Sequence, residues 1–90
     1  MPIFVPGQIV ATKEALHALD GCDVHPTTLL DRHCSGDWGE VGQEDCEANE
    51  RAVREGGQRV LSKYVVQGRS FYVITEHDRS YTTLMLTSDY

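Results

Sequence analysis

The last third of the chain carries the pattern that most restricts its fold: three short segments rich in β-branched and aromatic residues, at 59–66, 70–76 and 81–86. Residues of these types are enriched in β-strands. The dipeptide Gln67-Gly68 and the stretch His77-Asp78-Arg79-Ser80 separate the segments, and both are typical of turns. Three strands joined by such short turns predict an antiparallel meander.

The middle strand of this meander is apolar on both of its faces. Phe71, Val73 and Thr75 alternate along it with Tyr72, Ile74 and Glu76. Successive side chains of a strand point to opposite faces of the sheet. We therefore expect helices to cover one face, and part of the other face to be exposed or to contact a partner.

Upstream of the meander the sequence favours short helices. Helical spacing of apolar residues and helix-end signals predict them at about residues 13–19, 26–34 and 43–55. In the third helix, Glu44 and Asp45 lie in the first turn, where the helix dipole favours negative charge. Glu47 and Arg51 are spaced for an ion pair in this helix, as are Glu50 and Arg54.

The remaining N-terminal residues predict a strand and an arm. Residues 8–11 form a short apolar run, and an extended arm at residues 1–7 is expected along a sheet edge. Helices on one side of an antiparallel sheet make an α+β fold. We expect a single small domain over residues 1–90, with a three- to four-stranded antiparallel sheet and about three short helices on one face.

The net charge narrows the classes of partner. A formal charge of −6 argues against direct binding of nucleic acid, which needs clustered Lys and Arg. No Lys or Arg occurs from His33 to Glu50, where the acidic residues are Asp37, Glu40, Glu44, Asp45, Glu47 and Glu50. This acidic stretch serves either solubility or the binding of a basic partner.

Cysteine usage and hydropathy predict a cytoplasmic protein with no membrane partner. The three cysteines, Cys22, Cys34 and Cys46, form no C-x-x-C pair, so reduced thiols are expected. The chain shows no charged-then-apolar leader and no run of eighteen apolar residues.

Two enzymatic interpretations find little support in the residues. His33 and Cys34 are adjacent, and neighbours on a helix point about 100° apart, so His33 is poorly placed as a base for Cys34. Zinc sites need spacings such as C-x₂₋₄-C, and Cys22-x-x-His25 is the only close pair here. We therefore expect no enzymatic activity, no catalytic residue, no metal and no cofactor.

Two polar stretches have both a structural and a functional interpretation. Around Asp37 and Trp38 we favour a structural corner, in which the carboxylate binds loop amides and the indole fills the core. The alternative is a carboxyl group desolvated by the ring, with a raised pKa. The stretch 75–83 is either a simple hairpin turn or a partner-binding surface anchored by Arg79 and Tyr81.

Four motifs carry a resemblance to a known group of proteins. They are Arg32-His33-x-Ser35-Gly36-Asp37-Trp38-Gly39, Glu44-Asp45-x-x-x-Asn49, Gly57-x-Arg59-Val60-Leu61-Ser62-x-Tyr64 and Ile74-Thr75-Glu76-x-Asp78-Arg79-Ser80-x-Thr82-Thr83. Over residues 28–90 the chain resembles small proteins borne on plasmids, phages and other mobile elements, which are often labelled as restriction-modification subunits. This resemblance implies a counter-defence role, because the group includes inhibitors of type I CRISPR surveillance complexes. It implies no catalytic residues.

The resemblance and the charge lead to one hypothesis, an anti-CRISPR-type inhibitor of a type I effector (Cascade) complex. Such a complex holds DNA along grooves lined by Lys and Arg, which an acidic surface can occupy. The residues expected to bind the partner are Asp37, Trp38, Glu40, Glu44, Asp45, Glu47, Glu50, Arg79 and Tyr81. A small regulator that binds another host protein and a metal or thiol enzyme remain as alternatives, and homodimerisation through an exposed strand stays open.

Overall fold

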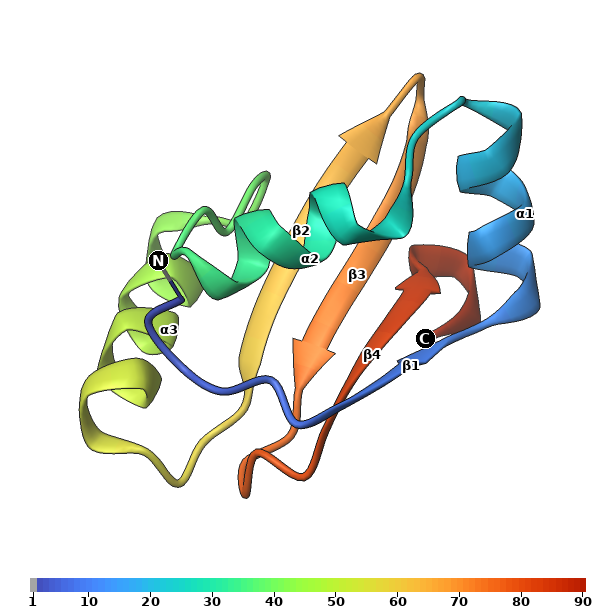
Figure 1. Cartoon of the computed structure of the whole chain (residues 1–90). Helices are drawn as coiled ribbons and strands as arrows, with labels where there is room; N and C mark the ends of the chain where they lie inside the picture. The colour runs from blue at the N-terminus through green and yellow to red at the C-terminus, as the bar shows by residue number, and fades with distance from the viewer. Residues whose placement is uncertain (1) are drawn as a thin grey trace.

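The structure, a computed structural model, describes residues 2–90, so Met1 of the expected arm lies outside the described residues. The elements in chain order are β1 (Gln8–Ala11), α1 (Lys13–Gly21), α2 (Pro26–Cys34), α3 (Gln43–Glu55), β2 (Val60–Val66), β3 (Arg69–Thr75), β4 (Tyr81–Leu86) and the short 3₁₀ helix η1 (Thr87–Asp89). Three helices and a four-stranded sheet confirm the α+β class (Figure 1).

The strands follow the order β1-β4-β3-β2 across the sheet. β2, β3 and β4 form the predicted antiparallel meander. The turn from β2 to β3 has positive φ at both Gln67 (48°) and Gly68 (81°), the backbone of a type I′ hairpin turn. β1 differs from the expectation of a wholly antiparallel sheet, because it pairs parallel with β4. A tight hairpin forces two strands to run antiparallel, but β1 and β4 are joined through all the elements between them, so they can pair parallel.

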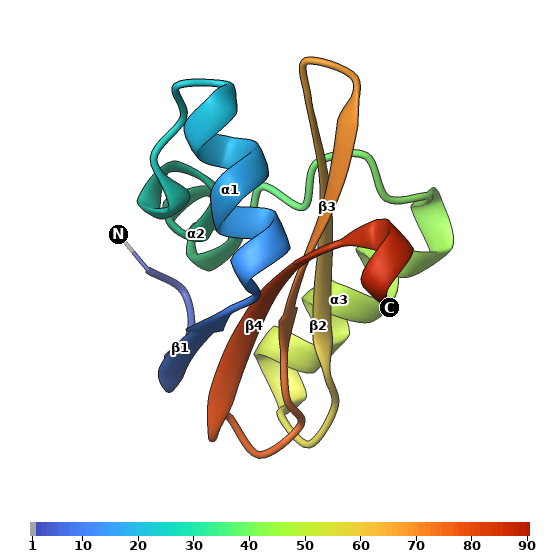
Figure 2. The same cartoon turned by 90° about the vertical axis from the view of Figure 1, so that its right-hand side faces the viewer.

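Two of the three helices cover one face of the sheet. α1 and α2 lie on the same side, as Figure 2 shows. The main core lies beneath them and is built from α1, α2 and the inward residues of the strands. Its buried residues are Ala15, Ala18, Leu19, Leu29, Tyr64, Phe71, Val73, Leu84 and Leu86.

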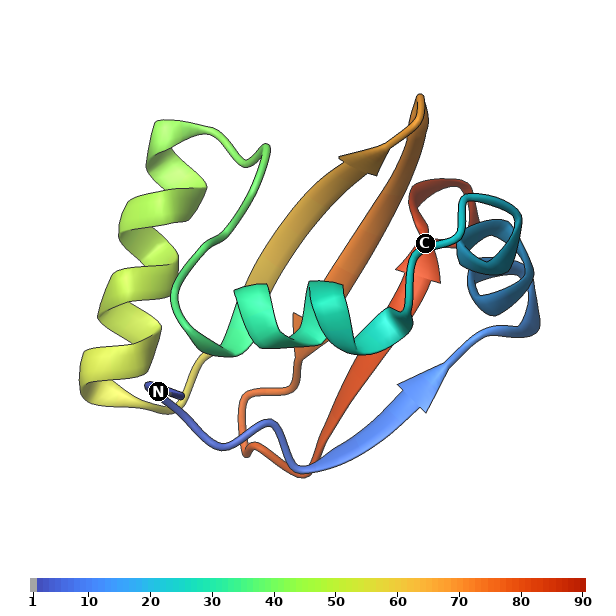
Figure 3. The same cartoon turned by 45° about the horizontal axis from the view of Figure 1, so that its top comes forward.

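α3 lies alongside β2 rather than above the middle of the sheet (Figure 3). It adds a second, smaller core cluster, in which Ala52 packs with Trp38 and Val60. The third helix therefore departs from the expected packing on one face. The opposite face of the sheet is partly open, as expected: Tyr90 packs edge-to-face on Tyr72 at 5.4 Å between ring centroids, and Val65 stays 49% exposed.

The outer edge of β2 is closed by side chain and backbone together. Asn49 Nδ2 of α3 donates to the Leu61 carbonyl (2.7 Å), and Asn49 Oδ1 accepts from the Leu61 N–H (2.9 Å). Two residues further, the Lys63 N–H donates to the Trp38 carbonyl (3.1 Å) and its carbonyl accepts from the Glu40 N–H (2.6 Å). The backbone groups that an edge strand would leave unpaired are thus satisfied over this span.

Gly39 permits the close approach of this second segment. Its φ is +72°, and a Cβ atom there would lie 2.1 Å from the Lys63 carbonyl oxygen. No residue with a side chain fits, so glycine is required for the strand-like contact between residues 38–40 and β2.

The closure of β2 gives a stability prediction. Asn49 is 3% exposed, so Asn49→Ala leaves the Leu61 N–H and carbonyl unpaired beside α3. We expect the free energy of unfolding to fall by about 3 kcal/mol, because each unsatisfied buried group costs roughly 1–3 kcal/mol. Urea unfolding measures this change. Glu50→Ala, at an exposed site of the same helix, is the control and should change stability by less than about 0.5 kcal/mol. Equal losses in both variants would contradict the assigned role of Asn49.

Candidate functional site

An acidic surface lies on and just before α3. Glu44, Glu47 and Glu50 follow one another at spacings of three residues, which places them along one side of the helix. Asn49 and Ala52 are the buried residues of α3, and they turn that side toward solvent. We call Glu44, Glu47 and Glu50, all exposed, the acidic helix surface. Glu40 and Asp45 are exposed too, but Glu40 lies in the loop bonded to β2, and Asp45, four residues before Asn49, lies on the strand-facing side of α3.

No ion pair among residues 2–90 neutralises this surface. The pairs formed are Arg32–Asp37, Arg54–Glu55 and Arg59–Glu76. The pairs expected within α3 are not made: Arg54 turns to Glu55 at 3.3 Å, and Glu47 accepts instead from Gln43 Nε2 at 2.9 Å. The spacing permits those pairs, but an exposed i,i+4 pair contributes only a few tenths of a kcal/mol, too little to enforce one rotamer. Arg51 and Arg54 lie in the C-terminal half of α3, so the negative charge concentrates in the N-terminal half.

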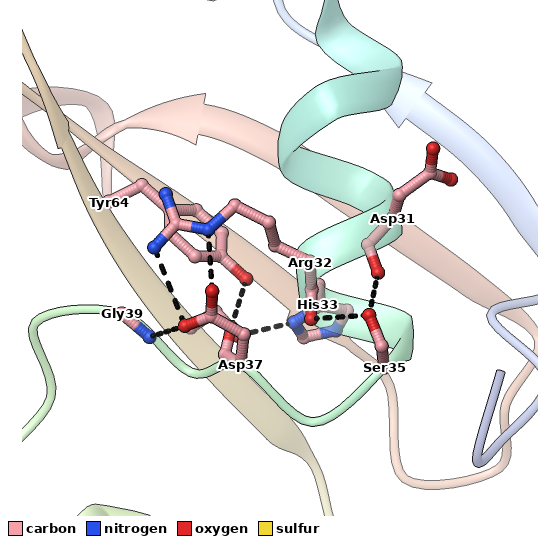
Figure 4. A network of polar contacts seen from close by, with 8 residues as sticks. Asp31, Arg32, His33, Ser35, Asp37, Gly39 and Tyr64 are labelled. Carbon is pink, nitrogen blue, oxygen red and sulfur yellow. Dashed lines mark hydrogen bonds and ion pairs between the residues drawn. The ribbon is translucent and has the colours of Figure 1, made fainter. Parts of the chain in front are cut away.

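Asp37 lies at the corner between α2 and β2, and its negative charge is paired with Arg32 (Figure 4). Its Oδ2 accepts from Arg32 Nε at 2.7 Å, and its Oδ1 accepts from the Gly39 N–H at 3.2 Å. The hydrogen bond from Arg32 is the main reason that the pKa of Asp37 lies below its usual range. The Tyr64 hydroxyl donates to the Asp37 carbonyl at 2.7 Å, and burial raises the pKa of Tyr64 to about 12. The favoured structural interpretation of this corner is confirmed.

Trp38 and Arg79, both expected to contact a partner, lie instead within the scaffold. Trp38 is 5% exposed and stacks on Phe4 at 6.3 Å between ring centroids. Arg79 donates from Nη2 to the Ala52 carbonyl (2.9 Å) and from Nη1 to the Gln58 carbonyl (2.6 Å), and its guanidinium lies over the Phe4 ring. Arg79 thus fastens the end of α3 and the arm to the β3–β4 turn. Trp38 is thus buried, and Arg79 is half-buried and bonded within the chain.

Tyr81 is exposed but lies away from the acidic helix surface. It is 41% exposed on β4, opposite Gln8 of β1. Two strands, β3 and β2, separate β4 from α3. The structure therefore brings together three of the nine expected residues, Glu44, Glu47 and Glu50. The other six lie elsewhere: Asp37, Trp38, Glu40, Asp45, Arg79 and Tyr81.

A buried polar chain that sequence reasoning missed runs through the core. His33 Nδ1 lies 2.6 Å from Ser62 Oγ, and His33 Nε2 lies 2.9 Å from Thr75 Oγ1. Thr75 Oγ1 lies 2.6 Å from Thr82 Oγ1, which donates to the Pro6 carbonyl at 2.6 Å. A carbonyl can only accept, so Thr82 donates to Pro6, Thr75 donates to Thr82, and His33 Nε2 donates to Thr75. The signal in the sequence was polar residues at inward-facing strand positions.

This direction of bonding places a proton on Nε2 of His33, and in the neutral ring Nδ1 then accepts from the Ser62 hydroxyl. Burial, with a smaller effect of Arg79, lowers the pKa of His33 to about 4. His33, Ser62, Thr75 and Thr82 are all 0% exposed, so the chain of hydroxyl groups ties α2, three strands and the arm together without reaching the surface.

The thiols of Cys34 and Cys46 and the potential metal ligands of residues 2–90 differ from what a reactive cysteine or a metal site requires. Burial raises the pKa of Cys34, and the pKa of Cys46 is also raised, whereas a nucleophilic cysteine needs a lowered one. Within residues 2–90, no three His, Cys, Asp or Glu side chains gather as a metal site would require.

Comparison with known protein families, with curated proteins and with solved structures finds no match. Across residues 2–90, every helix is too short or too polar to cross a membrane.

The buried His33 gives a pH prediction. The fold favours the neutral ring, so the unfolded chain, with a pKa near 6.5, takes up a proton first as the pH falls. This contribution to stability is complete above pH 6.5 and is lost between there and about pH 4, a decrease of about 3 kcal/mol. Urea unfolding across that range measures the loss.

Two comparisons isolate the effect of His33. His33→Gln should flatten the pH dependence of stability, whereas His17→Gln, at an exposed position, should retain it. An NMR titration of the wild-type His33 ring should show a midpoint near 4. A midpoint near 6.5 would contradict the buried neutral state.

Proposed function

We propose that this chain is a non-enzymatic inhibitor that binds a type I CRISPR effector complex through the acidic helix surface and keeps target DNA from docking. The observation that carries this proposal is the exposure of three carboxylates along one side of α3, none of them in an ion pair among residues 2–90. Carboxylates already paired with internal arginines would attract a basic partner only weakly. Carboxylates outside ion pairs retain more of their attraction for a Lys- and Arg-lined groove that binds phosphate.

The choice of partner rests on the resemblance to small mobile-element proteins, and the structure explains the motifs behind that resemblance. Most motif residues build the scaffold: Asp37 and Gly39 form the corner, Asn49 closes β2, and Arg79 fastens the β3–β4 turn. Only Glu44, in the first turn of α3, belongs to both a motif and the acidic helix surface.

The scaffold supports a rigid mode of binding. α3 is held at β2 by Asn49 and at its C-terminal end by Arg79, so its exposed side has a fixed direction. A preorganised surface loses less conformational entropy on binding than a flexible acidic tail would. The proposed place of action is the cytoplasm, where such an effector works, and all three cysteines are free thiols.

Charge reversal on α3 tests the proposal. The variant Glu44→Lys/Glu47→Lys/Glu50→Lys should weaken binding to a purified type I effector complex at least about 100-fold, or about 3 kcal/mol, because attraction becomes repulsion. The wild-type affinity should also fall with added salt, and the variant should lose that dependence. Surface-immobilised effector complex and a biosensor measure both quantities.

A matched control separates a local surface from net charge alone. Glu14→Lys/Asp20→Lys/Asp31→Lys changes the net charge by the same amount at exposed positions of α1 and α2. This control should bind within a few-fold of the wild type. If it loses as much affinity as the α3 variant, the acidic helix surface is not the binding site. If the α3 variant binds like the wild type, charge complementarity is not the mechanism.

A further inference from the structure

The two edge strands of the sheet, β2 and β1, differ in whether their outward backbone groups are hydrogen-bonded. The edge at β2 is closed by Asn49 and by residues 38–40, as described above. At the other edge, the N–H groups of Gln8 and Thr12 donate to the Ser80 and Leu84 carbonyls of the neighbouring chain segment, both at 3.1 Å. Backbone groups alternate in direction along a strand, so those of Ile9 and Ala11 point away from β4. No other backbone group of residues 2–90 bonds them.

Exposed apolar side chains gather at this open edge. Ile9 and Val10 of β1 are 45% and 44% exposed. Val5 of the arm and Tyr81, opposite Gln8, are 70% and 41% exposed. The arm and β1 together run along one side of the molecule (Figure 3). β1 itself, Gln-Ile-Val-Ala, contains none of the Lys, Pro or inward charges that commonly protect an edge strand.

We propose that β1 pairs antiparallel with β1 of a second copy of this chain, about a two-fold axis at Val10. In this register Ile9 lies opposite Ala11 of the second copy, and Ala11 opposite its Ile9. The two pairs exchange four N–H···O bonds, which satisfy every outward-facing group of the strand. The Val10 side chains of the two copies meet on the outer face, and the four-stranded sheet becomes continuous across both copies.

The register itself favours a second copy as the occupant. A pairing centred on Ile9 would place Ala11 opposite Gly7, whose φ of +69° is not that of a strand. The N–H and carbonyl of Ala11 would then stay without a partner. Centred on Val10, the four residues of β1 are self-complementary, as a two-fold interface requires.

The position of the acidic residues also fits a second copy as the occupant, and the small area of contact limits the strength of the dimer. The acidic helix surface lies beyond β2, at the far edge of the sheet, so two copies paired through β1 hold their negative charges at opposite ends. A four-residue strand pair alone falls short of the roughly 1,000 Å² of a specific interface, and the exposed Val5 and Tyr81 add only part of the difference. The result is a weak dimer, in the micromolar range, rather than a permanent one.

Sedimentation equilibrium over a concentration series tests the dimer. The wild type should shift from monomer to dimer as its concentration rises from low micromolar to millimolar. Val10→Lys places two ammonium groups face to face and should raise the dimer dissociation constant at least about tenfold. Val65→Lys is the matched control, a half-exposed valine on the same outer face at the far side of the sheet, and should leave it unchanged. A wild type that stays monomeric throughout, or equal effects of both variants, would overturn the proposal.

A disulfide test checks the register and stands even if Val10→Lys fails to fold. Directly opposed residues of a non-hydrogen-bonded pair have Cα atoms about 4.5 Å apart, within the range that a disulfide spans. With Cys22, Cys34 and Cys46 replaced by serine, Val10→Cys should form covalent dimers in oxidised glutathione, and Val65→Cys should not. Equal cross-linking of both would overturn the register.

Salt distinguishes this proposal from the proposed function. Added salt screens the repulsion between two acidic copies and should tighten the dimer, whereas it should weaken binding to a basic effector groove. Val10→Lys should bind the effector complex like the wild type, because β1 lies away from α3. Either proposal can therefore fail while the other stands.

Discussion

The structure depends on how the outer edge of β2 finds its hydrogen-bond partners. A four-stranded sheet in a chain of 90 residues has two edges and little material to cover them. Here Asn49 pairs with Leu61, and residues 38–40 pair with Lys63, a contact that only glycine at position 39 permits. Because Asn49 faces the strand, the opposite side of α3 faces solvent. The position of the exposed glutamates is thus a consequence of edge closure.

Polar contacts also join the two apolar clusters into one interior. His33 lies beside the rings of Phe4 and Trp38, at 5.2 and 6.0 Å between centroids, and bonds Ser62 and Thr75 beneath the main core. A small domain buries limited apolar surface, so a fully satisfied polar chain adds both stability and a unique arrangement. Through Thr82 and Pro6 the same chain fixes the arm, which leads directly into β1.

Local signals in the sequence were sufficient for the elements, whereas partners distant in the chain were not predictable. The 43–55 helix, the short strand at 8–11 and the final strand were placed with the observed bounds, because caps, turn residues and side-chain periods are local. The parallel pairing of β1 with β4 and the position of α3 beside β2 depend on contacts between distant residues. For the same reason the sequence suggested Arg79 and Trp38 as binding anchors. In the structure Arg79 donates to backbone carbonyls of distant residues, and Trp38 stacks on Phe4. The acidic run was visible in the sequence, but that Arg32 pairs with Asp37 while the residues from Glu40 to Glu50 form no ion pair was not.

The central proposal is that a rigid helix presents unpaired carboxylates to a basic protein groove. Carboxyl-group footprinting by mass spectrometry, with and without a purified type I effector complex, tests it most directly, because it reads the solvent access of each acidic side chain in the unmodified protein. The account predicts that labelling of Glu44, Glu47 and Glu50 drops in the complex while that of Glu14 and Asp20 on α1 stays the same. Undiminished labelling of the three α3 glutamates in a complex that does form would contradict it.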